Sequence, residues 1–328
     1  MANLKSTTIS DTGFLQLPTG TTAQRPASPT AGEIRFNTDT KVTEWYDDQL
    51  DSWFPTGFVP PIATGGDTVE DVNIGGVTYR IHSFTTVGES TFTVTRGGPV
   101  DYLIVAGGGG SGSNGGSGGG AGGFLQGTRT VKAKNYSIVV GNGGQPDERI
   151  LSGRPCGGDG ENTSAFGFTA IGGGGGVPGG SSTVNIVFPG GSGGGSSDYG
   201  SRGPYVGGSG TPGQGNKGAD SRSSGSTPNW ANGGGGGAGG PAPNVSNDGS
   251  VSAVVGEGGP GVASNISGTL IFRAGGGAGQ SISGVTALGG IGGGGASDLP
   301  GDSNTGGGAG GNNKAGGSGI VIIRYRIS

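Results

Sequence analysis

Hydrophobic and polar residues alternate in several short segments of the chain, and this pattern predicts β-strands. In residues 33–54 (EIRFNTDTKVTEWYDDQLDSWF), Ile34 and Phe36 flank Arg35, and a second alternating segment follows the turn sequence NTDTK. Period-two alternation of β-branched and aromatic residues is typical of strands with one covered face. We therefore expect a β-hairpin with an aromatic face. The preceding proline-containing segment reads as an extended arm.

More strands are expected further along. Residues 77–85 (VTYRIHSFT) and 90–96 (STFTVTR) alternate, whereas residues 101–106 (DYLIVA) form a continuous apolar run, as in a strand covered on both faces. Residues 128–144 contain another strand-like insertion, and residues 319–327 (GIVIIRYRI) have the strongest strand pattern. We expect the runs at 101–106 and 319–327 to pair in one small sheet. Because no segment of ten residues free of Gly and Pro has helical periodicity, little or no helix is predicted.

Glycine tracts dominate the region between residues 107 and 319. The chain has 86 Gly in 328 residues and is only 29% hydrophobic, far from the composition of a domain with one large apolar core. The tracts occupy residues 107–123, 172–180, 190–195, 233–240, 256–261, 275–279, 289–295 and 306–319. Any apolar core is therefore small and local.

Four structures could explain these tracts. Flexible linkers are the default for Gly/Ser sequences, but linkers join domains and these tracts make up much of the largest segment. Collagen needs Gly at every third position, and the unbroken glycines at 107–110 violate that register. The match to G-x-G-x-x-G at 110–115 follows a strand, yet no helix can follow to hold a pyrophosphate.

The fourth structure is an array of packed polyglycine-II helices. This conformation has three residues per turn and no internal hydrogen bonds, so its N–H and C=O groups are free to bond neighbouring helices. A single tract would not stay ordered, because one net hydrogen bond returns less than the cost of fixing a glycine. We expect many tracts to pack together and strands to close the array at both ends.

Composition excludes several functions. A net charge of -4 gives no basic footprint for nucleic acid. The lone Cys156 and lone His82 do not form a metal cluster, no catalytic residues are expected, and no cofactor is implied. The N-terminus has no signal-peptide pattern, and no run is long and apolar enough to insert in a membrane. We expect a non-enzymatic protein that is assembled in a reducing cytoplasm.

Two inserts between the tracts resemble binding loops. Residues 197–208 (SDYGSRGPYVGG) and 220–234 (DSRSSGSTPNWANGG) mix flat aromatic rings with small polar residues, a combination that suits adaptable recognition. The aromatic side chains could equally plug the end of a glycine array. The candidate receptor-binding residues are Tyr199, Arg202, Tyr205 and Trp230.

The order of these segments resembles a known family. The run from HSFTTVGESTFTV through DYLIVAGGGG, YSIVVGNGG and repeated GGGGAGG-like tracts to GGSGIVIIRYRI is similar to glycine-rich tail-fibre and virion proteins of tailed bacteriophages, over roughly residues 77–328. Residues 17–54 resemble a small β-module near the start of phage fibre proteins. The resemblance implies polyglycine-II helices that present variable loops to host receptors.

From the resemblance we expect an all-β protein in three parts. Residues 1–62 form a virion-attachment β module, residues 63–106 a β support, and residues 107–328 a glycine-rich domain closed by the strand at 319–327. The candidate attachment residues are Phe36, Trp45, Tyr46 and Trp53.

The expected function is that of a tail fibre or tip adhesin in the virion. Its expected partners are other virion proteins, further copies of the chain in a trimer, and a bacterial surface glycan or outer-membrane protein. A head or neck fibre with a purely structural role is the alternative. A depolymerising tailspike is a weaker third class, because long β-helix repeats are missing.

Overall fold

The computed structural model divides the chain into two compact units, Met1–Pro60 and Pro61–Ser328. It describes residues 13–48, 51–57, 60–146, 149–151, 153–180, 188–197, 205–223, 232–247, 256–280 and 286–327. The protein is nearly all β, as the sequence predicts. In the described residues the only helical element is one 3₁₀ turn, Thr22–Gln24, and no helix in that part of the chain is long and apolar enough to cross a bilayer.

The N-terminal unit is built on one four-stranded sheet. Its strands are β1 (Thr19–Gly20), β2 (Ile34–Asn37), β3 (Val42–Asp47) and β4 (Ser52–Pro55), in that spatial order. Strands β2 and β3 pair antiparallel around the NTDTK turn, which confirms the predicted hairpin. Strand β4 extends the hairpin to a meander.

A charged cluster lies buried on one face of this sheet. Glu44 is only 2% exposed; its carboxylate accepts two hydrogen bonds from Arg25, at 2.6 and 3.1 Å, and one from the Asn37 amide at 3.0 Å. Arg35 lies 3.5 Å from the same carboxylate. Burial alone would raise the pKa of Glu44, but these hydrogen bonds and the two arginine charges together lower it.

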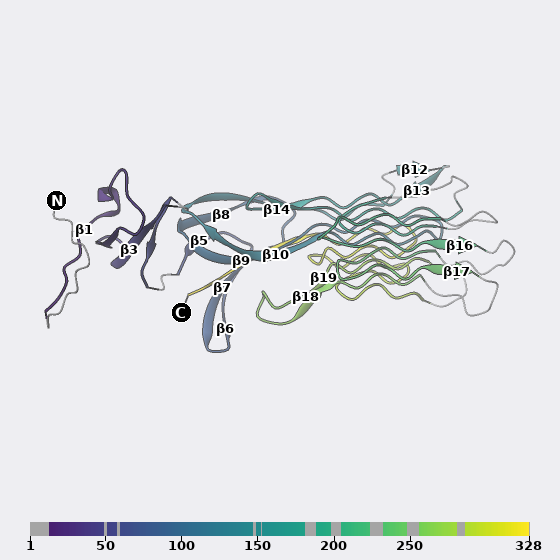
Figure 1. Ribbon diagram of the computed structural model, residues 1–328. Helices are drawn as coiled ribbons and strands as arrows, with labels where there is room; N and C mark the ends of the chain where they lie inside the picture. Colours follow the sequence, from purple (N-terminus) through teal and green to yellow (C-terminus); the bar gives the residue numbers. More distant parts are fainter. Residues whose placement is uncertain are drawn as a thin grey trace. The chain divides into compact units, whose positions relative to one another are not determined.

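Two five-stranded sheets pack face to face in the second unit (Figure 1). The first has the order β10-β9-β20-β7-β6 and the second β15-β14-β11-β8-β5. The strands of the first sheet are β6 (Thr68–Ile74), β7 (Val77–Phe84), β9 (Gly98–Val105), β10 (Phe124–Val131) and β20 (Ile320–Arg326). Those of the second are β5 (Ile62–Thr64), β8 (Gly88–Arg96), β11 (Lys134–Val140), β14 (Thr163–Ala165) and β15 (Phe168–Ala170).

Strand β9 is covered on both faces, as its continuous apolar run predicts. Ile104 belongs to the core between the two sheets, with Phe92 and Ile323. Its neighbour Leu103 points the other way, into a second cluster that contains Ile266. Strand β20 pairs antiparallel with β9, so the expected pairing of the runs at 101–106 and 319–327 is confirmed.

His82 is a structural residue within the sandwich. Its side chain is fully buried, with Nδ1 2.6 Å from the Gly65 carbonyl oxygen and Nε2 3.1 Å from the Tyr325 hydroxyl. Burial lowers the pKa of His82. The ring is therefore neutral near pH 7, and its neighbours leave it no access to a substrate.

Short strand pairs complete the second unit. The hairpin β18 (Val262–Ser264) and β19 (Ile271–Arg273) carries Ile266 into the cluster on the outer face of the first sheet. The remaining pairs are β12 (Arg149–Leu151) with β13 (Arg154–Cys156), and β16 (Ser221–Ser223) with β17 (Val245–Asn247).

The buried carboxylate predicts an acid-sensitive N-terminal unit. Because the folded-state pKa of Glu44 is below its ordinary value of 4.5, its contribution is present above pH 4.5 and is lost as the pH falls through the folded-state value. We expect Glu44→Gln, which leaves two arginines unpaired, to lower the free energy of unfolding at pH 7 by about 3 kcal/mol. Asp48→Asn, at an exposed position, is the control. Denaturant titrations at pH 7 and pH 3 test this, and an equal loss at both pH values would contradict it.

Candidate functional site

The glycine tracts bond to one another through their backbones. In tract 106–113 the acceptor changes with each residue and returns to the same neighbouring segment every third residue. The first neighbour is segment 117–123, where Gly123, Gly120 and Ser117 accept from Ala106, Gly109 and Gly112. The second is segment 155–161, where Glu161, Gly158 and Pro155 accept from Gly107, Gly110 and Ser113. The third is segment 314–317, where Gly317 and Lys314 accept from Gly108 and Ser111.

This pattern differs from that of a β-sheet. A strand points successive residues to opposite sides and bonds at most two neighbours in one plane. Tract 106–113 donates its N–H groups to three neighbouring segments in rotation and returns to the same segment every third residue. The tracts therefore form a three-dimensional array rather than a layered sheet.

Tract 116–124 lies at the centre of the array. Every N–H from Ser117 to Phe124 donates to another segment, at 2.7–3.1 Å. Backbone bonds connect residues 116–123 to six neighbouring segments, 106–112, 171–177, 192–195, 233–236, 277–280 and 306–309, and Phe124 donates to Gln214. Six neighbours around one chain are possible only when every face of that chain is close to backbone.

Glycine is required at these positions because a Cβ would have no room. A Cβ on Gly119 would lie closer than 3.0 Å to the carbonyl oxygen of Gly109, and one on Gly120 equally close to that of Ser192. Ala121 is accommodated because its methyl group joins the apolar cluster beside the sandwich. Within the array, then, a side chain occurs where a space or a hydrogen-bond partner exists for it.

Polar side chains replace missing backbone acceptors at the rim. Gly172 and Gly175, three residues apart, donate their N–H groups to Asn162 Oδ1 and Asp159 Oδ1, both at 2.9 Å. Asn162 and Asp159 are also three residues apart, so the same repeat applies to side chains. Asp220 Oδ1 similarly accepts the Gly207 N–H at 2.8 Å.

The array runs away from the sandwich and has one end far from it (Figure 1). Strands β12, β13, β16 and β17 lie near that end. Hydrogen bonds join described residues there: Asn114 Nδ2 to Gly179 O at 3.3 Å, Ser197 Oγ to Asn232 Oδ1 at 2.9 Å, and Gln280 N to Gly116 O at 3.1 Å.

Five intervals of the sequence separate the described ranges in this region. They are 181–187, 198–204, 224–231, 248–255 and 281–285. Parallel pairing of β16 with β17 and the bond from Gly279 N to Gly256 O at 2.7 Å connect Ser223, Asn247 and Gly256 to the same end. Described residues that border each of the five intervals therefore lie at the end of the array opposite the sandwich.

Three of the four receptor-binding candidates fall in these intervals. Tyr199, Arg202 and Trp230 lie outside the described residues. Tyr205 is described and is 8% exposed; its backbone bridges to Ser221 through bonds of 2.9 and 3.0 Å. This burial favours the alternative role, a plug at the end of the array, for Tyr205.

The attachment candidates lie on opposite faces of the N-terminal sheet. The pairing registers place Phe36 and Trp45 on one face, where Trp45 lies 6.1 Å from the Phe54 ring and beside the exposed Ile34. Tyr46 and Trp53 lie on the other, 5.6 Å apart, and the Trp53 ring lies 5.9 Å from the Arg25 guanidinium. Because of strand alternation, a single flat contact cannot use all four.

The Tyr46 hydroxyl belongs to this second face and is already occupied. It donates to Asp51 Oδ1 at 2.7 Å, and this bond, with burial and nearby carboxylates, raises the pKa of Tyr46 to about 12. The adjacent charged cluster around Glu44 gave no signal in the hydrophobic pattern. Alternation of polar and apolar residues predicts which face of a sheet a side chain lies on. It does not predict which charged side chains pair with one another on that face.

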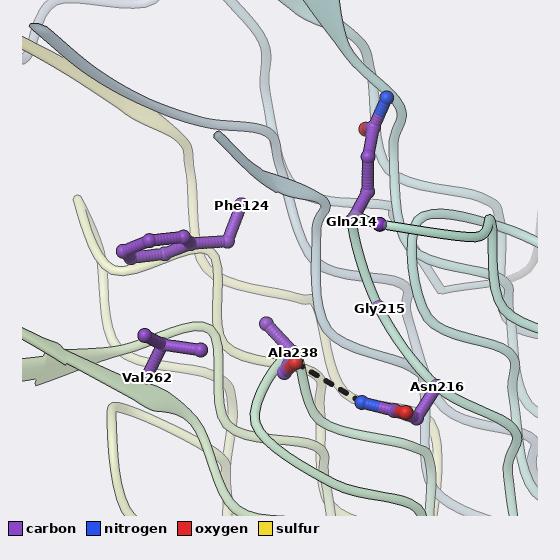
Figure 2. Close-up of a pocket in the computed structure, with 7 residues that line it drawn as sticks. Phe124, Gln214, Gly215, Asn216, Ala238 and Val262 are labelled. Carbon is purple, nitrogen blue, oxygen red and sulfur yellow. Dashed lines mark hydrogen bonds between the residues drawn. The ribbon is translucent and has the colours of Figure 1, made fainter. Parts of the chain in front are cut away.

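A shallow groove of about 250 Å³ lies where the array meets the sandwich (Figure 2). Phe124, Ala238 and Val262 line it with the segment 213–216. Its amides are engaged: Asn216 Nδ2 donates to the Gly237 and Ala238 carbonyls at 2.9 and 3.0 Å, and Gln214 Oε1 accepts the Ile171 N–H at 2.9 Å. No cluster of three His, Cys, Asp or Glu residues suited to a metal occurs in the described ranges.

The fold and the array together define an all-β protein with a glycine-rich domain. The profile of the glycine-rich domain family matches residues 85–326, so the chain belongs to that family. No curated protein gives a significant match to the sequence.

Packing at the centre of the array predicts intolerance to one methyl group. We expect Gly119→Ala to lower the free energy of unfolding by about 1 to 3 kcal/mol, the usual effect of overpacking, because its Cβ meets the Gly109 carbonyl. Ser209→Ala, at an exposed position, should change it by less than about 0.5 kcal/mol. Denaturant titration of both variants tests this; a Gly119→Ala protein as stable as the wild type would contradict the packing.

Proposed function

We propose that the protein is a virion structural protein of a tailed bacteriophage, a tail fibre or tip adhesin that recognises the host surface with segments at the free end of its glycine array. One observation carries the proposal: described residues that border five intervals of the sequence lie at the end of the array opposite the sandwich. Two of them contain the aromatic and arginine candidates Tyr199, Arg202 and Trp230.

In this proposal the glycine tracts are polyglycine-II helices. The three-residue rotation of hydrogen bonds and the exclusion of Cβ atoms at Gly119 and Gly120 support that conformation. Each bond contributes only about 0.5 to 1.5 kcal/mol net, but the bonds link every tract to several others. Such cross-linking makes a rigid platform that can hold recognition segments in fixed relative positions.

The N-terminal unit is the proposed attachment to the particle. Phe36 and Trp45, with the half-exposed Ile34, give one sheet face an apolar character that suits contact with another protein. We propose that this face contacts the virion or further copies of the chain in a trimer, and that Tyr46 and Trp53 support it from the other side of the sheet.

The proposal gives the protein no enzymatic role. Its partners are other virion proteins and a bacterial surface glycan or outer-membrane protein, and its location is the virion after assembly in the host cytoplasm. The N-terminal face would serve a head or neck fibre equally well, whereas a cluster of recognition segments at one end favours the adhesin.

The position of the protein on the particle tests the proposed role first. Gold-labelled antibodies against the second unit should mark the tail tip or tail fibres of intact phage particles in electron micrographs. Labelling confined to the capsid or neck would contradict the adhesin and leave the structural fibre.

Loss of the candidate contacts should abolish host binding. We expect Tyr199→Ala, Arg202→Ala and Trp230→Ala together to weaken binding of the purified protein to host cells at least about tenfold, because aromatic and arginine contacts dominate recognition energies. Ile291→Ala, exposed at the side of the array, is the matched control. Unchanged binding by the triple variant would contradict these residues as receptor contacts.

A further inference from the structure

The outer tract 256–261 donates N–H groups to described neighbours in two of its three directions. In tract 256–261, Gly258 and Gly261 donate to the Leu288 and Ile291 carbonyls at 3.0 and 2.8 Å, and Gly259 donates to Gly235 at 2.9 Å. The third direction belongs to residues 257 and 260. Both residues are exposed, and no described residue accepts the Glu257 N–H.

Residue 257 is glutamate and residue 260 is proline. Proline has no N–H, so no donor exists at position 260, and glutamate places a charged side chain over the other outward position. The neighbouring tract, joined through the bond from Gly239 N to Pro260 O at 2.9 Å, also has exposed prolines, although they are two residues apart rather than three. Its exposed positions 241 and 243 are also prolines, whereas Ala242 and Val245 between and after them donate to Lys217 and Asp220.

The same rotation applies on another side of the array. Positions 206, 209 and 212 are three residues apart, are exposed, and are valine, serine and proline. Inner tracts, in contrast, carry glycine wherever a Cβ would meet a neighbouring backbone. Side chains and prolines are thus placed at exposed positions beside which a further tract could otherwise be added.

We propose that these outward positions prevent a second copy of the chain from adding its glycine tracts to the side of the array. A bare glycine tract at the surface would present unpaired N–H and C=O groups and no Cβ, as an exposed β-sheet edge presents unpaired groups to another strand. Proline removes the donor, and at most glycine positions inside the array a Cβ would lie closer than 3.0 Å to a neighbouring backbone. The flank formed by Glu257, Pro260, Pro241 and Pro243 is therefore closed to lateral growth.

Restoring glycine on this flank should create an adhesive surface. The variant carries Glu257→Gly, Pro260→Gly, Pro241→Gly and Pro243→Gly. Its matched control carries alanine at the same four positions, which restores the N–H groups but keeps a Cβ. In sedimentation velocity of the full-length proteins, we expect the glycine variant to form concentration-dependent species larger than the wild type and the alanine variant to sediment as the wild type. Equal association of both variants, or of neither, would overturn the proposal.

A second substitution tests whether the Glu257 N–H lacks an acceptor, and its readout does not depend on association between copies of the chain. Glu257→Pro removes an N–H that has no acceptor, so we expect the melting temperature to change by less than about 2 °C in a unit of this size. A large fall in melting temperature would show that this N–H is in use, and would overturn the assignment even if the glycine variant failed to fold.

Discussion

Backbone hydrogen bonding between glycine tracts is the interaction on which the second unit depends. A tract that uses its N–H groups in three directions can have a neighbour on every side, but only if no Cβ intervenes. This explains why Gly119 and Gly120 sit in the centre of the array and why Ala121 occurs where its methyl group meets the sandwich. It also explains why Asp159 and Asn162, at the rim, act as acceptors in place of a missing tract.

The β-sandwich sets the register of the array. Strands β9 and β10 pair Val105 with Phe124, and the next bonds, from Ala106 to Gly123 and Gly109 to Gly120, continue the same antiparallel pairing into the tracts. The pairing of β9 with β20 continues in the same way, through the bond from Gly108 to Gly317. An apolar core, which strongly specifies register, thus aligns glycine tracts that have almost no side chains to align themselves.

The sequence predicts the strands well because their signal is local. Alternation places the β2–β3 hairpin, and the apolar runs of β9 and β20 identify the buried centre of the first sheet. The neighbours of each glycine tract could not be predicted. The tracts have nearly identical sequences, so no sequence pattern distinguishes which tract packs beside which. Two features of the candidate sites could not be fixed for a related reason. The sequence left Tyr205 open between a receptor contact and a plug, and it did not separate Phe36 from Tyr46, because both outcomes depend on tertiary packing and register. We propose that the end of the array far from the sandwich recognises the host and that the sandwich supports the array.

Amide hydrogen exchange of residues 117–124, resolved by NMR in the intact protein, tests the central claim most directly. All eight N–H groups in this tract have backbone acceptors, so slow exchange is expected at every position, including both glycine and non-glycine residues. Rapid exchange throughout the tract would mean that the glycines form a flexible linker, and would contradict an array held together by its backbone.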